Sequence, residues 1–334
     1  MPSISAVIPT WNRADLLRSL LPNLRRQMRP LDEIIVVDNG STDNTADVVD
    51  EHNATLVRFP VNRGFAEAVN EGIRHAAGEW VFILNNDVLL DPAFVGTLLA
   101  AAEEEGADFA AGKILQRDPP GVLDGSWDLV SRGAYAWRCG YGRQDGGVWS
   151  QRRKISLAPM TAALFRRDIF DRIGWLETRF ESYYEDVDFG VRCAVAGLKG
   201  IYEPAAVCFH LGKATYGKRA ARVYFLSARN QVLLLAKHYR RETLRRFAWA
   251  IFVGQMLALF AATKQGHPIA ALRGKWQALQ QWGTFRKGMA EDGSGAAQAL
   301  EAAVSESERE ILELQKQTGF DIYWRLYFSL VRPG

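Results

Sequence analysis

The first hundred residues alternate short apolar runs with helical patterns, and no other feature of the sequence constrains the fold as strongly. Apolar runs predict strands at 4–8, 33–37, 56–59 and 80–84. Helical patterns lie between and after them at 16–24, 46–49, 64–77 and 91–105. Because strands and helices that alternate at this pitch form a largely parallel sheet covered by helices, the sequence predicts an α/β fold.

Three of the four predicted strands end in polar loops. These are Thr10-Trp11-Asn12, Asp38-Asn39-Gly40-Ser41 and Asn85-Asn86-Asp87. Sheets of this kind bind ligands at the carboxyl ends of their strands. The three loops therefore predict one binding site.

The rest of the chain changes character twice. Residues 121–147 are rich in Gly, Asp and Trp and predict a loop-rich insertion or short strands near the site. Strand-like sequence at 155–165, a charged helix within 183–196 and a strand at 200–209 follow, the last ending at His210. After residue 223 the pattern is helical to the end, which predicts a helical C-terminal extension.

Composition excludes several classes of protein. The 334 residues suffice for one domain and a substantial extension. A net charge of +3 is too small to indicate a nucleic-acid partner. The three scattered cysteines fit no disulfide framework or zinc site, so a reducing compartment is expected. The N-terminus reads as a short strand, so no signal peptide is expected.

Asp87 is the first candidate for chemistry. A carboxylate flanked by amides at a strand end can hold Mg²⁺, which uses one or two carboxylates together with substrate phosphates. The alternative is an ordinary turn, since Asn and Asp favour turns. His210 also ends a strand, and it would complete a metal site only if Asp87 lies nearby.

The run Glu185-Asp186-Val187-Asp188 is the second candidate. Three carboxylates at a helix start can simply stabilise the helix dipole. One of them at the mouth of a site could instead take a proton from an attacking hydroxyl.

Two further positions can contact a nucleotide. Arg63-Gly64 precedes a helix, where the helix start and the guanidinium can meet a phosphate or a base. Asp38 can accept a hydrogen bond from a base imino group. The alternatives are a plain helix start and a turn.

The order and spacing of these segments carry more information than any one of them. The runs AVIPTWNRADLL, EIIVVDNGSTDNT, NRGFAEAVNEGI, FILNNDVLLDP, RRDIFDRIG and YYEDVDFGVRCAVAGLKGIYEPAAVCFHLG resemble the family 2 glycosyltransferases, and most closely their bacterial rhamnosyltransferase-like branch. The resemblance covers about residues 3–230. It implies the GT-A fold, a Rossmann-like mixed sheet flanked by helices.

The resemblance also implies a role for each candidate. Pro9, Thr10 and Trp11 match the loop that packs on the nucleotide base, and Asp38 matches the acid that reads the pyrimidine edge. Arg63 and Gly64 match a second base or phosphate contact. Asn85, Asn86 and Asp87 match the metal motif, and His210 matches a further metal ligand. Glu185 and Asp186 match the catalytic pair, with Asp186 as the base. Asn85 departs from the family, in which many members carry the first Asp of the motif here. Thr161 stands where the family typically has Gly, so the floor of the acceptor pocket is expected to differ.

The implied reaction is a single inverting displacement. Mg²⁺ or Mn²⁺ neutralises the leaving diphosphate, and Asp186 takes the proton of the acceptor hydroxyl. The expected donor is a dTDP or UDP sugar, with a deoxyhexose such as rhamnose favoured. The expected acceptor is a glycan or a lipid-linked oligosaccharide in cell-surface polysaccharide synthesis.

We expect a glycosyltransferase domain over 1–222, with its nucleotide-sugar half to about 115 and its acceptor half over 116–222, and a helical extension over 223–334. Ten basic residues between Lys213 and Arg246 precede an apolar run at 247–263. This pattern indicates peripheral attachment to an anionic leaflet. The resemblance implies that this is the cytoplasmic face of the inner membrane. The alternative is a helix buried in the extension or in a homodimer interface.

Two other functional classes share some of these features. A sugar nucleotidyltransferase also uses an α/β sheet and a metal, but it needs a Gly-rich loop after the first strand, where this chain has Pro9-Thr10-Trp11-Asn12-Arg13. A non-catalytic carbohydrate-binding protein on the same fold should lack the base, yet Asp186 is present.

Overall fold

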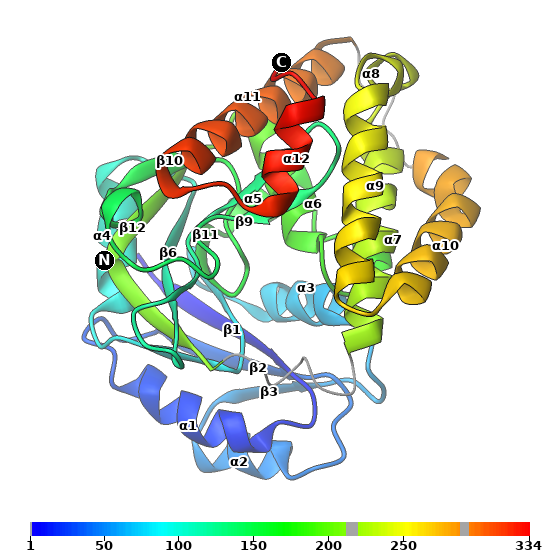
Figure 1. Cartoon of the computed structure of the whole chain (residues 1–334). Helices are drawn as coiled ribbons and strands as arrows, with labels where there is room; N and C mark the ends of the chain where they lie inside the picture. The colour runs from blue at the N-terminus through cyan, green and yellow to red at the C-terminus, as the bar shows by residue number, and fades with distance from the viewer. Residues whose placement is uncertain (1, 212–219, 288–293) are drawn as a thin grey trace. The chain divides into compact units, whose positions relative to one another are not determined.

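The computed structural model describes residues 2–211, 220–287 and 294–334 (Figure 1). The chain divides into two compact units. Of the described residues, unit 1 takes 2–128 and 138–211, and unit 2 takes 129–137, 220–287 and 294–334. The short hairpin of β8 (Asp128–Val130) and β9 (Ala136–Arg138) carries the chain from unit 1 into unit 2 and back.

A mixed sheet forms the centre of unit 1. Its main path runs β10-β12-β6-β11-β4-β1-β2-β3, with β5 added beside β12 and β7 beside β6. The strands are β1 (Ile4–Thr10), β2 (Glu33–Asp38), β3 (Thr55–Arg58), β4 (Trp80–Leu84), β5 (Val88–Leu90), β6 (Phe109–Gln116), β7 (Leu123–Gly125), β10 (Arg153–Ile155), β11 (Ala162–Arg166) and β12 (Gly200–His210).

Strand direction divides the sheet into two parts. β3, β2, β1 and β4 are parallel, as the alternation of strands and helices predicts. β11 is antiparallel to both of its neighbours, β4 and β6, while β12 and β6 are parallel to each other. The sheet is therefore mixed. The predicted strand at 155–165 is two strands, β10 and β11, that lie in different parts of the sheet.

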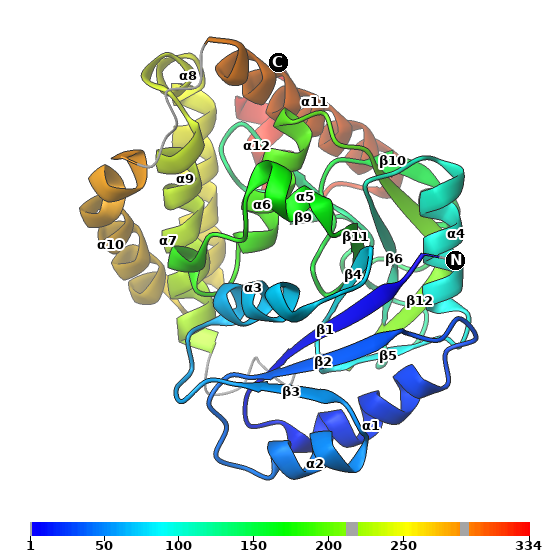
Figure 2. The same ribbon diagram turned by 180° about the vertical axis from the view of Figure 1, so that it is seen from behind.

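Helices cover both faces of this sheet, because its central strands are apolar on both sides. The helices of unit 1 are α1 (Ala14–Arg25), α2 (Thr45–Glu51), α3 (Phe65–His75), α4 (Phe94–Glu104), α5 (Asp168–Ile173) and α6 (Glu185–Val195). Leucines of α1 pack with α4 against one face of the sheet. Helix α3 covers the other face (Figure 2). Its Gly72 lies against Val7 and Val37, where a Cβ would clash.

Most predicted elements are confirmed, with small corrections at their ends. The helix expected from residue 91 begins later, because α4 starts at Phe94 with Ala93 as its N-cap residue. Asp91 lies before it, and its carboxylate accepts from the backbone N–H of Ala93 in a turn. All three cysteines are free and buried, in keeping with the absence of a disulfide framework.

Unit 2 is helical apart from the segment 129–137. Its helices are α7 (Ala220–His238), α8 (Arg241–Arg246), α9 (Ala248–Lys264), α10 (Pro268–Lys287), α11 (Ser294–Thr318) and α12 (Ile322–Leu330). The buried carboxylate of Glu308 holds the segment in place, because it pairs with Arg132 at 2.5 Å and accepts from the Tyr327 hydroxyl at 2.7 Å. In the described ranges, no helix has both the length and the apolar character needed to cross a bilayer. Lys213, Lys218 and Arg219 of the predicted basic block lie outside the described residues.

Candidate active site

The polar ends of β1, β2 and β4 meet at one edge of the sheet. Thr10 and Asp38 are register partners at the ends of β1 and β2, with Pro9 one position earlier and Trp11 one position later. The Asn86 amide, after β4, donates to the Thr10 hydroxyl at 2.8 Å. The structure thus brings together the loops that the sequence places in one site.

Asp38 is buried at this edge. One carboxylate oxygen accepts from the backbone N–H of Ser41 at 2.8 Å, and the other lies 3.2 Å from Nε of Arg58. That second oxygen accepts no hydrogen bond from any described residue. It is buried, and the neighbouring Arg58 guanidinium balances its charge.

Arg63 and Gly64 lie beside the loop after β2. The backbone N–H of Arg63 donates to the Asn39 side chain at 2.7 Å, and the Arg63 guanidinium stacks over Phe59. Gly64 has φ of 90° and lies so close to Glu181 that a Cβ would come within 2.8 Å of its carbonyl oxygen. Gly64 is thus required by the close approach of α3 to the segment before α6.

Asp87, His210 and Asp124 form a chain of contacts between β4, β12 and β7. Nε2 of His210 lies 3.1 Å from a carboxylate oxygen of Asp87, and Nδ1 lies 3.0 Å from Asp124. β12 pairs with β5 so that His210 stands opposite Val88, which places its ring beside Asp87. Burial lowers the pKa of His210, but the two carboxylates outweigh it and raise the pKa to about 9.

Asp87 and His210 fit a divalent metal as a pair. Two adjacent ligands of an octahedral Mg²⁺, each at about 2.1 Å, stand roughly 3 Å apart, close to the separation observed here. A cation would replace the proton at Nε2, since a histidine ligand is neutral. The described residues contain no group of three or more His, Cys, Asp and Glu side chains arranged to hold a metal. The remaining ligands would therefore come from substrate and water.

Strained backbone introduces α6. Glu181, Tyr183 and Tyr184 all have φ between 64° and 72°, a region that non-glycine residues rarely adopt. This path sets Glu185 and Asp186 at the first turn of α6. Burial and the nearby Asp128 raise the pKa of Asp186 to about 6, against the lowering effect of Arg138. Burial and the neighbouring Asp186 raise the pKa of Glu185 well above its ordinary value.

The guanidinium of Arg138 lies among the carboxyl groups of the site. Its guanidinium pairs with Asp128 at 3.2 Å, lies 3.5 Å from Asp186 and donates to the Thr161 hydroxyl at 3.3 Å. Its charge also interacts with that of Asp124, the partner of His210. The side chain runs directly over Gly125, where a Cβ would clash with it.

Sequence reasoning does not identify Asp124, Asp128 or Arg138. They lie in the segment 121–147, which the sequence marks only as rich in Gly, Asp and Trp. Asp124 and Arg138 meet His210 and Asp186, which stand far along the chain, so no spacing identifies these contacts. The tryptophans of this segment pack inside the protein, with Trp127 against Trp149 and Tyr202.

Comparison with known proteins identifies this architecture. The model of the family "Glycosyl transferase family 2" matches residues 5–174, just over half of the chain. The chain belongs to glycosyl transferase family 2. It is a glycosyltransferase, and the sugar nucleotidyltransferase and the non-catalytic binding protein are less well supported.

A relative from Mycobacterium tuberculosis and two solved structures are similar to this chain. The relative is an N-acetylglucosaminyl-diphospho-decaprenol L-rhamnosyltransferase, 29% identical over 62% of this chain and 75% of that protein. The mannosyltransferase PcManGT from Pyrobaculum calidifontis, in complex with GDP-Man and Mn²⁺, has a TM-score of 0.53 and 20% identity over 98% of this chain and 86% of that one. GalNAc-T7 with UDP, GalNAc and Mn²⁺ has a TM-score of 0.63 and 12% identity over 96% of this chain and 58% of that one. This glycosyltransferase therefore has the GT-A fold expected from its sequence, with a helical C-terminal part.

Proposed function

We propose that this glycosyltransferase moves a deoxyhexose such as rhamnose from a dTDP or UDP donor, with inversion, to a hydroxyl of a glycan or lipid-linked oligosaccharide. The rhamnosyltransferase relative supports this sugar and a lipid-linked acceptor. The product belongs to bacterial cell-surface polysaccharide synthesis. The transferase domain spans residues 1–222, with its nucleotide-sugar half to about 115, and a helical extension spans 223–334.

The donor binds across the ends of β1, β2 and β4. Pro9, Thr10 and Trp11 pack on the base, and the Asp38 carboxylate accepts its imino N–H. The further contacts to base, ribose or phosphate are made by Arg63, Gly64, Asn85 and Asn86.

Asp87 and His210 would hold Mg²⁺ or Mn²⁺ at the diphosphate. A metal bound there would supply positive charge opposite the leaving nucleoside diphosphate. Asp124 keeps the His210 ring in position from the opposite nitrogen.

Asp186 removes the proton of the acceptor hydroxyl as the new glycosidic bond forms. Its pKa of about 6 suits a base that works near neutral pH, because the carboxylate is ionised there but still basic. Burial and the Asp186 charge raise the pKa of Glu185 well above its ordinary value, which supports Asp186 as the base of the pair. One displacement with no covalent intermediate inverts the anomeric carbon.

One observation carries this proposal: Arg138 lies 3.5 Å from Asp186 and runs over Gly125, the residue next to Asp124, whose carboxylate contacts His210. This supports a single charged site within unit 1 that includes both the base and the metal pair. Such a site can supply a base and metal ligands to one reaction.

We place the reaction at the cytoplasmic face of the inner membrane, with the enzyme attached peripherally. A lipid-linked acceptor supports this location, since its sugar head group lies at the membrane surface. Basic residues and an apolar surface on unit 2 support it as well.

The test is nucleoside diphosphate release from a panel of dTDP, UDP and GDP sugars, with Mg²⁺, with Mn²⁺ and with EDTA. We expect metal-dependent turnover of one donor. Asp186→Asn should lower the rate by about 10²- to 10⁴-fold, the usual contribution of a general base. Asp171→Asn, at an exposed acid of α5, serves as the matched control and should retain full activity.

Two results would contradict the proposal. Full activity of Asp186→Asn would remove Asp186 as the base, and full activity in EDTA would remove the metal. NMR of the product anomeric centre checks the stereochemistry separately, because retention would require a nucleophile that the proposal does not include.

A further inference from the structure

Helix α10 of unit 2 has an inverted pattern of burial. Its small residues Ala271, Gly274 and Ala278 are buried, and Gly274 packs closely on the backbone of Phe225 in α7. Its large apolar residues Ile269, Leu272, Trp276 and Leu279 are each more than half exposed. A helix of a soluble protein normally buries its large apolar face, so the outer face of α10 is suited to an apolar environment.

Helix α9 shows the same inversion. Ala250, Val253, Gly254 and Ala262 are buried, while Trp249, Phe252, Met256 and Phe260 form an exposed stripe along the helix. The alternative of a buried helix therefore does not hold for the outer face of this apolar run. Gln255 contacts Lys275, which joins α9 to α10.

Helix α12 extends the same apolar surface on the other side of α9, as Figure 1 shows. The Trp249 indole donates to the backbone carbonyl of Leu330, which joins the two helices. Ile322, Leu326 and Leu330 are exposed. The exposed apolar residues of α9, α10 and α12 are called the apolar face below.

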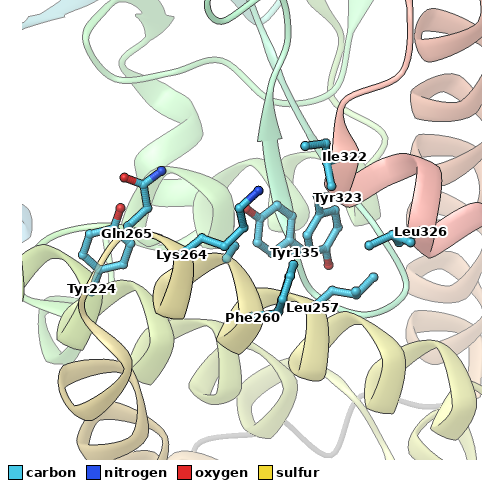
Figure 3. Close-up of a pocket in the computed structure, with 10 residues that line it drawn as sticks. Tyr135, Tyr224, Leu257, Phe260, Lys264, Gln265, Ile322, Tyr323 and Leu326 are labelled. Carbon is cyan, nitrogen blue, oxygen red and sulfur yellow. The ribbon is translucent and has the colours of Figure 1, made fainter.

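A cavity of about 300 Å³ opens between α9 and α12. Its lining includes the exposed Phe260, Ile322 and Leu326, so its mouth belongs to the apolar face (Figure 3). Stacked rings of Tyr135 and Tyr323 form part of its wall. The apolar face is thus indented by a mainly apolar hollow that can take a hydrocarbon chain.

The charge on helices α7 to α10 is almost entirely positive. Residues 220–287 contain twelve Lys and Arg side chains and a single acid, Glu242. Arg245, Lys264 and Arg273 are exposed on the same helices or next to them. Like charges on two copies would repel each other, whereas anionic phospholipid head groups attract this surface.

We infer that the apolar face of unit 2 is a docking surface for an anionic phospholipid bilayer. Aromatic and aliphatic side chains of α9, α10 and α12 enter the acyl boundary, and basic side chains contact the head groups. The inference specifies the surface and the lipid for the peripheral attachment proposed above. It rests on the proposed function only for the location at the membrane. It does not depend on the transfer reaction.

Vesicle flotation of the full chain tests the inference. Wild-type protein should float with vesicles of phosphatidylcholine mixed with phosphatidylglycerol, bind phosphatidylcholine alone more weakly, and lose part of its binding in high salt. Phe252→Glu on α9 and Trp276→Glu on α10 should each reduce the bound fraction by about tenfold or more, since each removes a large apolar side chain that would be buried in the bilayer. Met28→Glu, at a residue of unit 1 that is 77% exposed, is the matched control and should bind like wild type.

Sedimentation velocity of the same variants separates lipid from a second copy. A wild-type dimer that both glutamate variants dissociate, with vesicle binding unchanged, would assign the apolar face to self-association and overturn the inference. Failure of the wild type to bind anionic vesicles would overturn it too. Both positions are more than half exposed, so the variants should keep the wild-type circular dichroism spectrum. Flotation needs no donor sugar, so either result is independent of the proposed glycosyl transfer.

Discussion

Asp124 lies 3.0 Å from Nδ1 of His210, on the side of the ring opposite the nitrogen that faces Asp87. This contact fixes the ring's orientation and keeps Nε2 directed at the Asp87 carboxylate. Histidine ligands of metals commonly have such a carboxylate partner on their second nitrogen. Asp124 is therefore expected to act on the metal through His210, as a positioning residue.

Removing the Asp124 carboxylate should weaken metal binding. We expect Asp124→Ala to lower Mn²⁺ affinity by about 10- to 100-fold and Asp124→Asn to lower it less, because the amide oxygen can still accept from Nδ1. Electron paramagnetic resonance of free Mn²⁺ measures this without any substrate.

His210→Ala and Asp47→Asn complete this experiment. His210→Ala removes the ligand itself and should weaken binding at least as much as Asp124→Ala. Asp47, exposed on α2, should be neutral when changed to Asn. Equal affinity of wild type and His210→Ala would show that the metal lies elsewhere, whereas a loss confined to His210→Ala would remove only the role of Asp124.

The rate of transfer should depend on pH through Asp186. Its pKa is raised to about 6, so the carboxylate is protonated below that pH and cannot accept the acceptor's proton. We expect the rate to rise with pH through about 6 and to level off above it, with roughly a tenfold fall for each pH unit below. Initial rates at saturating donor and metal, measured in overlapping buffers, give this profile. A rate independent of pH between 5 and 7 would argue against Asp186 as the base.

Arg138 should set the position of that profile. Its guanidinium lies 3.5 Å from Asp186 and lowers the pKa of the carboxyl. Arg138→Gln removes this charge, so the midpoint of the acidic limb should move upward by about 1 to 3 pH units. Arg138→Lys keeps the charge and should shift it less. If both variants are slower at every pH but the midpoint of the acidic limb is unchanged, Arg138 positions groups of the site and does not set the pKa of Asp186.

The strand ends were predictable because their signal is local. Thr10, Asp38 and Asn86 each follow a short apolar run, and parallel strands bring their carboxyl ends to one edge. The roles of Asp186 and His210 followed from the resemblance to the family. The sequence pattern alone left both residues with ordinary structural explanations.

The remaining charged residues could not be predicted, because long-range packing creates their contacts. Asp124 meets His210 across 86 positions of the chain, and Arg138 meets Asp186 only after β9 and α6 are placed. The reversed direction of β11 was hidden for a similar reason. An apolar run does not specify which neighbours it pairs with or in which direction.

The close packing of Gly64 should make it intolerant of any side chain. Alanine there has to adopt φ of 90°, and its Cβ would lie 2.8 Å from the Glu181 carbonyl oxygen, which belongs to backbone and cannot swing aside. Gly106→Ala is the matched control, because Gly106 has φ of 56° but open space around its Cβ. We expect Gly106→Ala to cost about 1 kcal/mol of unfolding free energy from backbone strain alone. Gly64→Ala should cost about 2 to 4 kcal/mol, since the clash adds to the strain. It should also weaken donor binding, because Gly64 belongs to the proposed donor site. Urea unfolding followed by circular dichroism gives both free energies, and equal costs for the two variants would show that α3 can move away from Glu181 without penalty.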